Sequence, residues 1–208
     1  MSKVFIGVGH GGKDPGAVAN GLEEKHLTLS IAKVCAAHLE RHGVTVKMSR
    51  TTDADDPVNE VVRECNAFSP DLAVDIHVNA GGGTGFEAYY HYGGGTSKTL
   101  AQKVEARIKA MGRKSRGCKI RQNSSGNDYY AFIRDTKAPA VILETAFIDS
   151  SDYQLIDTEA KRALYGEVYA KGILDTLGIA WTAQSENLAE TVKKYEAILA
   201  EIRKLSSI

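Results

Sequence analysis

The strongest constraint on the fold of this chain is a regular alternation between short apolar runs and longer segments with helical periodicity. Runs typical of β-strands lie at residues 4–8, 44–48, 72–77, 86–92 and 140–148. Segments that predict helices, with apolar residues every three to four positions, lie at residues 24–42, 58–68, 97–111 and 159–177. Strands that alternate with helices through short connections form mostly parallel sheets. The sequence therefore predicts an α/β fold, with a twisted, mostly parallel sheet flanked by helices on both faces.

The region between residues 112 and 134 has the weakest pattern. It is polar and contains glycine, with weak strand character over residues 118–121, and residues 129–134 fit either a strand or a loop. The apolar run that follows at residues 140–148 is typical of a strand covered on both faces. We therefore expect that run to lie in the middle of the sheet.

The pattern changes near the C-terminus, which divides the chain into two parts. Residues 1–179 are predicted to form one catalytic domain, and residues 180–208 a C-terminal amphipathic helix. The helix prediction rests on apolar residues spaced four, three, four and three positions apart, at Leu188, Val192, Tyr195, Leu199 and Ile202. Such a helix would dock on the domain, link it to another domain, or form a homo-oligomer, and the spacing does not choose among these.

Composition excludes several classes of function. The 26 Lys and Arg residues balance 26 Asp and Glu residues, so no global positive field would hold nucleic acid or an acidic membrane surface. No apolar run approaches the roughly 18 residues that span a bilayer. The N-terminus runs directly into the first predicted strand without a signal peptide. Three cysteines without metal-type spacing do not form a disulfide framework. We expect a protein made in the cytoplasm.

Ionisable residues mark the carboxyl ends of three apolar runs. His10 follows the first strand, His77 ends the run at residues 72–77, Glu144 closes the run at residues 140–143, and Glu24 opens the helix after the first strand. Ligands of open parallel sheets bind at this edge, where the loops converge. The sequence thus predicts that these four side chains lie close together.

Two imidazoles and one carboxylate form the ligand set of a catalytic zinc ion, which keeps a fourth position open. Zn(II) bound by two neutral histidines and one carboxylate has a net charge of about +1, which acidifies a bound water. A second carboxylate is then needed as the base. Glu144 fits this role, because burial in an apolar run raises the pKa of a carboxyl group.

Each of these residues, taken alone, has a structural explanation. His10 fits a glycine-rich loop, His77 and Glu144 fit strand ends, and Glu24 or the adjacent Glu23 would complement the helix dipole. A loop that cradles phosphate is a further alternative, but no Walker-type Lys-Ser/Thr pair follows the first loop. Only the joint placement of the four residues favours a metal centre.

Several motifs, in order along residues 3–178, resemble the zinc-dependent N-acetylmuramoyl-L-alanine amidases of the amidase-3 type. The resemblance is carried by residues 9–17, 21–25, Ser49 with Arg50 and Asp53, Arg63 with Asn66, residues 75–80, 85–87 and 142–148.

The resemblance implies the cleavage of the amide bond between N-acetylmuramic acid and L-alanine in bacterial peptidoglycan. It assigns the zinc ligands to His10, Glu24 and His77 and the catalytic acid/base to Glu144, and it prefers Glu24 to Glu23 because the family's Glu-Lys pair matches Glu24 and Lys25. Another zinc amidohydrolase or peptidase acting on cell-wall amides is the alternative. With no signal peptide, the chain resembles the catalytic domain of a phage endolysin, released to the wall by holin-type lysis.

Two departures from the family's pattern affect the region of the predicted site. The family has Asp-Pro-Gly-His where this chain has residues 7–10, which start with Gly7, and it has Ser at the position of Asp75. Because side chains alternate along a strand, Asp75 is predicted to point to the same side as His77. There it would either orient a neighbouring side chain or lie at the surface.

Overall fold

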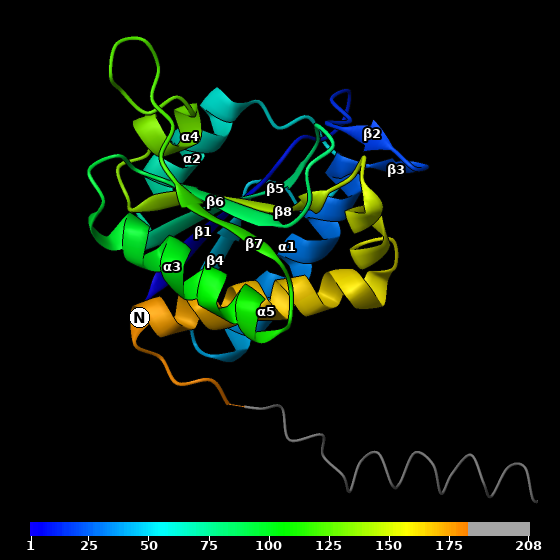
Figure 1. Cartoon of the computed structure of the whole chain (residues 1–208). Helices are drawn as coiled ribbons and strands as arrows, with labels where there is room; N and C mark the ends of the chain where they lie inside the picture. The colour runs from blue at the N-terminus through cyan, green and yellow to red at the C-terminus, as the bar shows by residue number, and fades with distance from the viewer. Residues whose placement is uncertain (183–208) are drawn as a thin grey trace, which may run out of the picture.

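A computed structural model describes residues 1–182 of the chain (Figure 1). A six-stranded sheet has the order β4-β1-β5-β8-β6-β7. Its strands are β1 (Lys3–Val8), β4 (Thr45–Met48), β5 (Leu72–Asn79), β6 (Phe86–Tyr90), β7 (Ser115–Lys119) and β8 (Ala140–Phe147). All neighbours pair in parallel except β6 and β8, which are antiparallel. The predicted mostly parallel sheet is confirmed, and the run at residues 140–148 does form a central strand.

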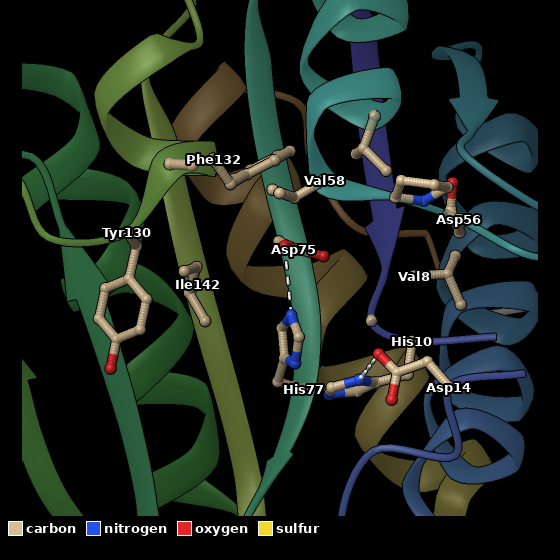
Figure 2. A pocket seen from close by; sticks show the side chains of 14 residues that line it. Val8, His10, Asp14, Asp56, Val58, Asp75, His77, Tyr130, Phe132 and Ile142 are labelled. Atoms are coloured by element: carbon tan, nitrogen blue, oxygen red, sulfur yellow. Dashed lines mark hydrogen bonds and ion pairs between the residues drawn. The ribbon is translucent and has the colours of Figure 1, made fainter.

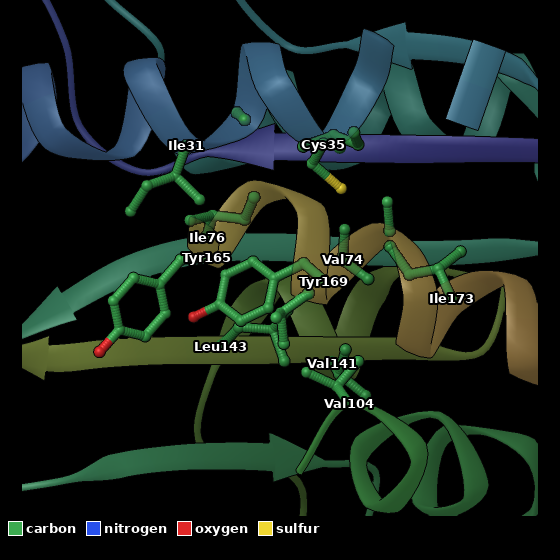
Figure 3. Close-up of a cluster of buried hydrophobic side chains, with 14 of the residues drawn as sticks. Ile31, Cys35, Val74, Ile76, Val104, Val141, Leu143, Tyr165, Tyr169 and Ile173 are labelled. Atoms are coloured by element: carbon green, nitrogen blue, oxygen red, sulfur yellow. The ribbon is translucent and has the colours of Figure 1, made fainter. Parts of the chain in front are cut away.

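Helices cover both faces of the sheet, as predicted. The helices are α1 (Glu24–Arg41), α2 (Val58–Phe68), α3 (Gly95–Ala110), α4 (Ala131–Asp135) and α5 (Glu159–Leu177). α1, α3 and α5 pack together on one face, where they enclose the larger core (Figure 3). α2 and α4 pack against each other on the opposite face over a smaller core. No helix within residues 1–182 is long and apolar enough to cross a membrane.

The face under α2 and α4 changes character along β5. Side chains alternate between the two faces of a strand, so Ala73, Asp75 and His77 share this face. Ala73 packs in the smaller core, whereas Asp75 and His77 lie beyond it towards the carboxyl end of the strand. The polar row of the sheet therefore begins where the helical cover of this face ends.

Apart from shifts of up to two residues at the ends of several helices and strands, three details differ from the sequence prediction. Residues 129–134 form neither a strand nor only a loop, because most of them lie in the short helix α4, whose buried Phe132 and Ile133 complete the smaller core. The weak strand is β7, which begins at Ser115 and ends at Lys119 instead of spanning residues 118–121. The structure adds a short hairpin, β2 (Val18–Ala19) with β3 (Leu22–Glu23), and a 3-10 helix at Ser151–Leu155. The predicted C-terminal helix lies outside the described residues.

Two glycines allow α5 to fit closely between α1 and α3. A β-carbon on Gly166 would lie 2.7 Å from the Ile31 carbonyl oxygen, and one on Gly172 would lie 2.6 Å from the Val104 α-carbon. The nearest atoms are backbone atoms of the neighbouring helices, which cannot rotate away. The three helices can therefore pack this closely only because α5 has glycine, which lacks a β-carbon, at these two positions.

We predict that Gly172→Ala destabilises the protein by about 1–3 kcal/mol, because the added methyl group overpacks the α3–α5 contact. Helix propensity alone predicts the opposite sign, a gain of up to about 1 kcal/mol. Denaturant unfolding monitored by circular dichroism measures the difference. Leu164→Ala, at an exposed position of the same helix, serves as the control, and a stabilised Gly172→Ala variant would contradict the close-packing argument.

Candidate metal centre and active site

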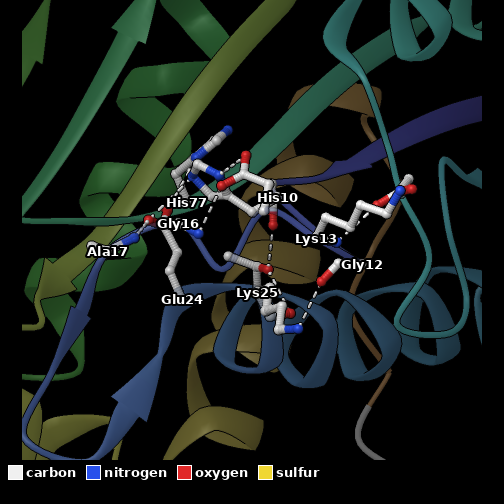
Figure 4. Close-up of polar contacts among 12 residues, drawn as sticks. His10, Gly12, Lys13, Gly16, Ala17, Glu24, Lys25 and His77 are labelled. Atoms are coloured by element: carbon white, nitrogen blue, oxygen red, sulfur yellow. Dashed lines mark hydrogen bonds and ion pairs between the residues drawn. The ribbon is translucent and has the colours of Figure 1, made fainter.

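His10 lies in the loop directly after β1, in a backbone conformation that non-glycine residues rarely adopt. Its φ is 64°, in the left-handed region. The imidazole Nδ1 is 2.8 Å from Asp14 Oδ2, and Nε2 is 3.2 Å from Glu24 Oε2 (Figure 4). A β-carbon on Gly16 would lie 2.6 Å from the His10 ring and 2.7 Å from Glu24 Oε2, so only glycine lets the loop close over this contact.

Glu24, the first residue of α1, is buried between the two histidines. Its Oε2 accepts the backbone N–H of Ala17 at 2.9 Å, and its Oε1 accepts that of Val78 at 2.8 Å. The same Oε1 is 3.1 Å from His77 Nδ1. Burial raises the pKa of Glu24, but hydrogen bonds from the two histidines outweigh burial and hold the pKa well below its usual range. The carboxylate is therefore ionised.

His77 lies near the carboxyl end of β5 and contacts a carboxylate with each ring nitrogen. Nδ1 faces Glu24, and Nε2 is 3.2 Å from Asp75 Oδ2 (Figure 2). Burial lowers the pKa of His77, yet the charges and hydrogen bonds of Asp75 and Glu24 raise it well above its usual value. The prediction that Asp75 points to the side of His77 is confirmed, and Asp75 is buried instead of lying at the surface.

These residues fit a metal ion. One donor atom from each of His10, Glu24 and His77 lies within 4.8 Å of the others. Each histidine also has its second nitrogen against a carboxylate, Asp14 for one and Asp75 for the other, which fixes ring orientation as in protein zinc sites. The three residues therefore form a group able to hold a metal ion.

Glu144 lies on β8, in register with His77 on one side and with Glu87 of β6 on the other. Partners in register point to the same face of a sheet, so Glu144 joins the polar row beside the metal-ligand group. Burial raises the pKa of Glu144 to about 7, although the nearby His77 opposes the shift. A carboxyl group with this pKa exchanges protons readily near neutral pH.

A cavity of about 320 Å³ opens beside the two histidines, between β1, β5 and α2 (Figure 2). Its walls include Val8, Val58 and Phe132, and three carboxylates, from Asp14, Asp56 and Asp75, also line it. Burial is the main cause that raises the pKa of Asp56. This side of the centre is therefore apolar and acidic.

The opposite side of Glu144 carries residues that the sequence reasoning missed. Glu87 is buried on β6 and forms ion pairs with Arg116 and Lys119 of β7. The motif at residues 85–87 belonged to the resemblance and marked Glu87 as notable, but the weak pattern of residues 112–128 gave no sign of its cationic partners.

The loop after β1 does not suit the alternative of a phosphate cradle. Asp14 and Glu24 point their carboxylates towards His10, in the space that an anion would need. All four residues predicted for the site lie towards the same edge of the sheet, and together they define an α/β domain with a group that could hold a metal ion beside the carboxyl group of Glu144.

Comparison with known proteins identifies the family. The profile of the family Amidase_3, described as N-acetylmuramoyl-L-alanine amidase, matches residues 4–175. The chain therefore belongs to this family, as the sequence motifs predicted, and it is identified as an N-acetylmuramoyl-L-alanine amidase.

Relatives with curated names and solved structures agree with this identification. A sporulation-specific N-acetylmuramoyl-L-alanine amidase of Bacillus subtilis is 35% identical over 190 residues, which cover 89% of this chain and 72% of the relative. An endolysin of Bacillus phage SPP1 is 37% identical, with 86% and 68% covered. The solved catalytic domain of CwlV, an amidase of Bacillus (Paenibacillus) polymyxa var. colistinus, superposes with a TM-score of 0.77 and 26% identity, covering 86% of this chain and all of that domain.

The raised pKa of Glu144 predicts a pH-dependent difference in stability between the metal-free wild type and Glu144→Gln. The folded protein binds the Glu144 proton more tightly than the unfolded chain, so this stabilisation is present below pH 4.5 and is lost as the pH rises through about 7. We would measure the free energy of unfolding in urea, with a chelator present, at pH 4.5 and pH 8. Between these pH values the wild type should lose about 1–3 kcal/mol more of this free energy than the variant. An unchanged difference would mean that Glu144 titrates normally.

Proposed function

We propose that this chain hydrolyses the amide bond between N-acetylmuramic acid and L-alanine of peptidoglycan, with Zn(II) bound by His10, Glu24 and His77. The observation that carries the proposal is the convergence of these three side chains beside Glu144, in a chain that belongs to the amidase family. Relatives named as an N-acetylmuramoyl-L-alanine amidase, as an endolysin and as a probable cell wall amidase support peptidoglycan as the substrate.

A zinc ion at this position would act as a Lewis acid that polarises the amide carbonyl and acidifies a water molecule. The protein's own groups supply the rest. Asp14 and Asp75 hold the two imidazoles in orientation. Because residue 16 is glycine, it places no side chain against His10 and Glu24.

We propose that Glu144 moves the protons of the reaction. In its ionised form the carboxylate removes a proton from the attacking water, and it then donates this proton to the nitrogen that leaves as the amino group of L-alanine. In the metal-free protein, burial raises the pKa of Glu144 to about 7, which supports a group that both accepts and donates protons. Its position in register with His77 supports this role.

Digestion of purified wall tests the proposed bond. We expect the zinc-loaded protein to release new amino termini on L-alanine, identified by labelling of amino groups followed by hydrolysis and chromatography. New amino groups on D-alanine, diaminopimelate or glucosamine would instead support the alternative, another zinc amidohydrolase or peptidase acting on the wall.

Two variants separate metal binding from proton transfer. Glu144→Gln should keep one zinc per chain and lose at least about a hundredfold in turnover, because the shape is retained while the base is lost. His77→Ala should lose zinc itself, since a ligand is removed. Zinc content by mass spectrometry and the rate of wall digestion check both variants. Substantial turnover by Glu144→Gln, or full zinc content in His77→Ala, would overturn the respective role.

The predictions about the domain bounds, the place of action, the release from the cell and the self-association of this protein remain proposals. Residues 1–179 as the catalytic unit and the wall as the site of action follow from the proposed activity. Release by holin-type lysis and self-association through the C-terminal helix rest on the sequence alone.

A further inference from the structure

Two cationic side chains converge at the edge of the sheet on the far side of Glu144. Lys119 Nζ lies 2.7 Å from Glu87 Oε1, and Arg116 donates from Nε to the same oxygen. Both cations lie on the edge strand β7, and their side chains remain 34% and 40% exposed. The pair is therefore positioned by a buried carboxylate but still accessible from solvent.

The strand order connects this pair to the reaction centre. His77 is in register with Glu144, and Glu144 is in register with Glu87, across the adjacent strands β5, β8 and β6. β7 is the next strand after β6. Neighbouring strands are about 4.8 Å apart, so β7 lies about 10 Å from β8.

Glu87 does not neutralise both cations. One carboxylate faces two positive groups, which leaves a net positive charge at the surface. Burial raises the pKa of Glu87, but hydrogen bonds from Lys119, Arg116 and Tyr89 outweigh burial and keep its pKa low. Tyr89 and Asn79 occupy its other oxygen, at 3.0 and 3.3 Å. Glu87 is thus an ionised, fully engaged anchor.

Arg116 presents free donors in a fixed plane. Its guanidinium lies over the Phe147 ring, 5.3 Å from the centroid, while Nε is bonded to Glu87. Within residues 1–182 the two Nη groups make no hydrogen bond to the protein. A guanidinium held in this way is suited to bind a carboxylate with two parallel hydrogen bonds.

Resting on the proposed amidase function, we propose that Arg116 and Lys119 bind a carboxylate on the residue that follows L-alanine in the stem peptide. An extended residue spans about 3.5 Å, so two residues reach about 7 Å from the scissile bond, and a side chain bridges the remaining distance to β7. The other side of the centre is lined by Asp14, Asp56 and Asp75, and no Lys or Arg among the described residues lines that cavity, so it offers an acidic peptide no lysine or arginine partner. The peptide therefore lies towards β7.

Inhibition of wall digestion tests this assignment with two probes that differ in charge. The probes are the dipeptide L-alanyl-D-glutamate and the same dipeptide with both carboxyl groups converted to amides. For each protein we compare the two inhibitory concentrations as a ratio, diamide over charged dipeptide. For the wild type we expect a ratio of at least about ten, because charge-assisted hydrogen bonds are lost in the diamide. Arg116→Gln and Lys119→Met should each reduce this ratio to below about threefold, and each leaves one cation to pair with Glu87.

Arg107→Gln is the matched control. Arg107 is 41% exposed and pairs with Asp175 on the opposite face of the sheet, so its variant should keep the wild-type ratio. A wild-type ratio near one, equal ratios in wild type and both β7 variants, or inhibition by neither probe would overturn the assignment. Thermal unfolding identifies any variant that fails to fold. In that case Arg116→Lys, which keeps the positive charge but loses the paired donors of the guanidinium, should give an intermediate ratio. If the wild type releases no L-alanine amino termini from wall, it is the proposed function that fails.

Discussion

The buried carboxylate of Glu24 joins three segments that lie far apart in the sequence. Each of its oxygens contacts one histidine and one backbone N–H, so the loop after β1, the start of α1 and the end of β5 meet at a single group. Arg50 supports the same junction from behind, where its buried guanidinium binds the carbonyls of Val8 and Lys25. A buried carboxylate is costly unless it is paired. Assembly of this corner of the fold and assembly of the metal-ligand group are therefore the same event.

The sheet explains why the remaining groups gather at this corner. Residues at alternate positions of β5 and β8 share a face, and α2 and α4 cover only the part of that face that carries apolar side chains. Beyond the cover the row becomes polar with His77, Glu144 and Glu87. The centre is consequently unequal on its two sides, with a cavity lined by three carboxylates beside α2 and an excess of cations at β7.

Local pattern was sufficient for much of this structure. Apolar runs and helical spacing located the central strands and the long helices, and α2 and α5 begin and end at the predicted residues. The four site residues could be predicted because His10 follows a strand, Glu24 opens a helix, and His77 and Glu144 lie towards the carboxyl ends of their strands. The short elements could not be predicted from local pattern. α4 is stabilised by burial of Phe132 and Ile133 in a core formed by distant segments, and β7 forms through its pairing with β6. The cations of β7 were missed because their importance depends on Glu87, more than 25 residues away.

The departure from the family's pattern at Gly7 and Asp75 is explained by strand register. By the sequence resemblance, the family usually has an acid at the position of Gly7 and a serine at that of Asp75, whereas this chain has the acid on β5. Gly7 and Asp75 are paired in register, and a β-carbon on Gly7 would lie 2.5 Å from Asp75 Oδ1. The acid at position 75 therefore occupies the space that a side chain at position 7 would fill. The carboxylate stays on the same face of the sheet and reaches His77 from its own strand.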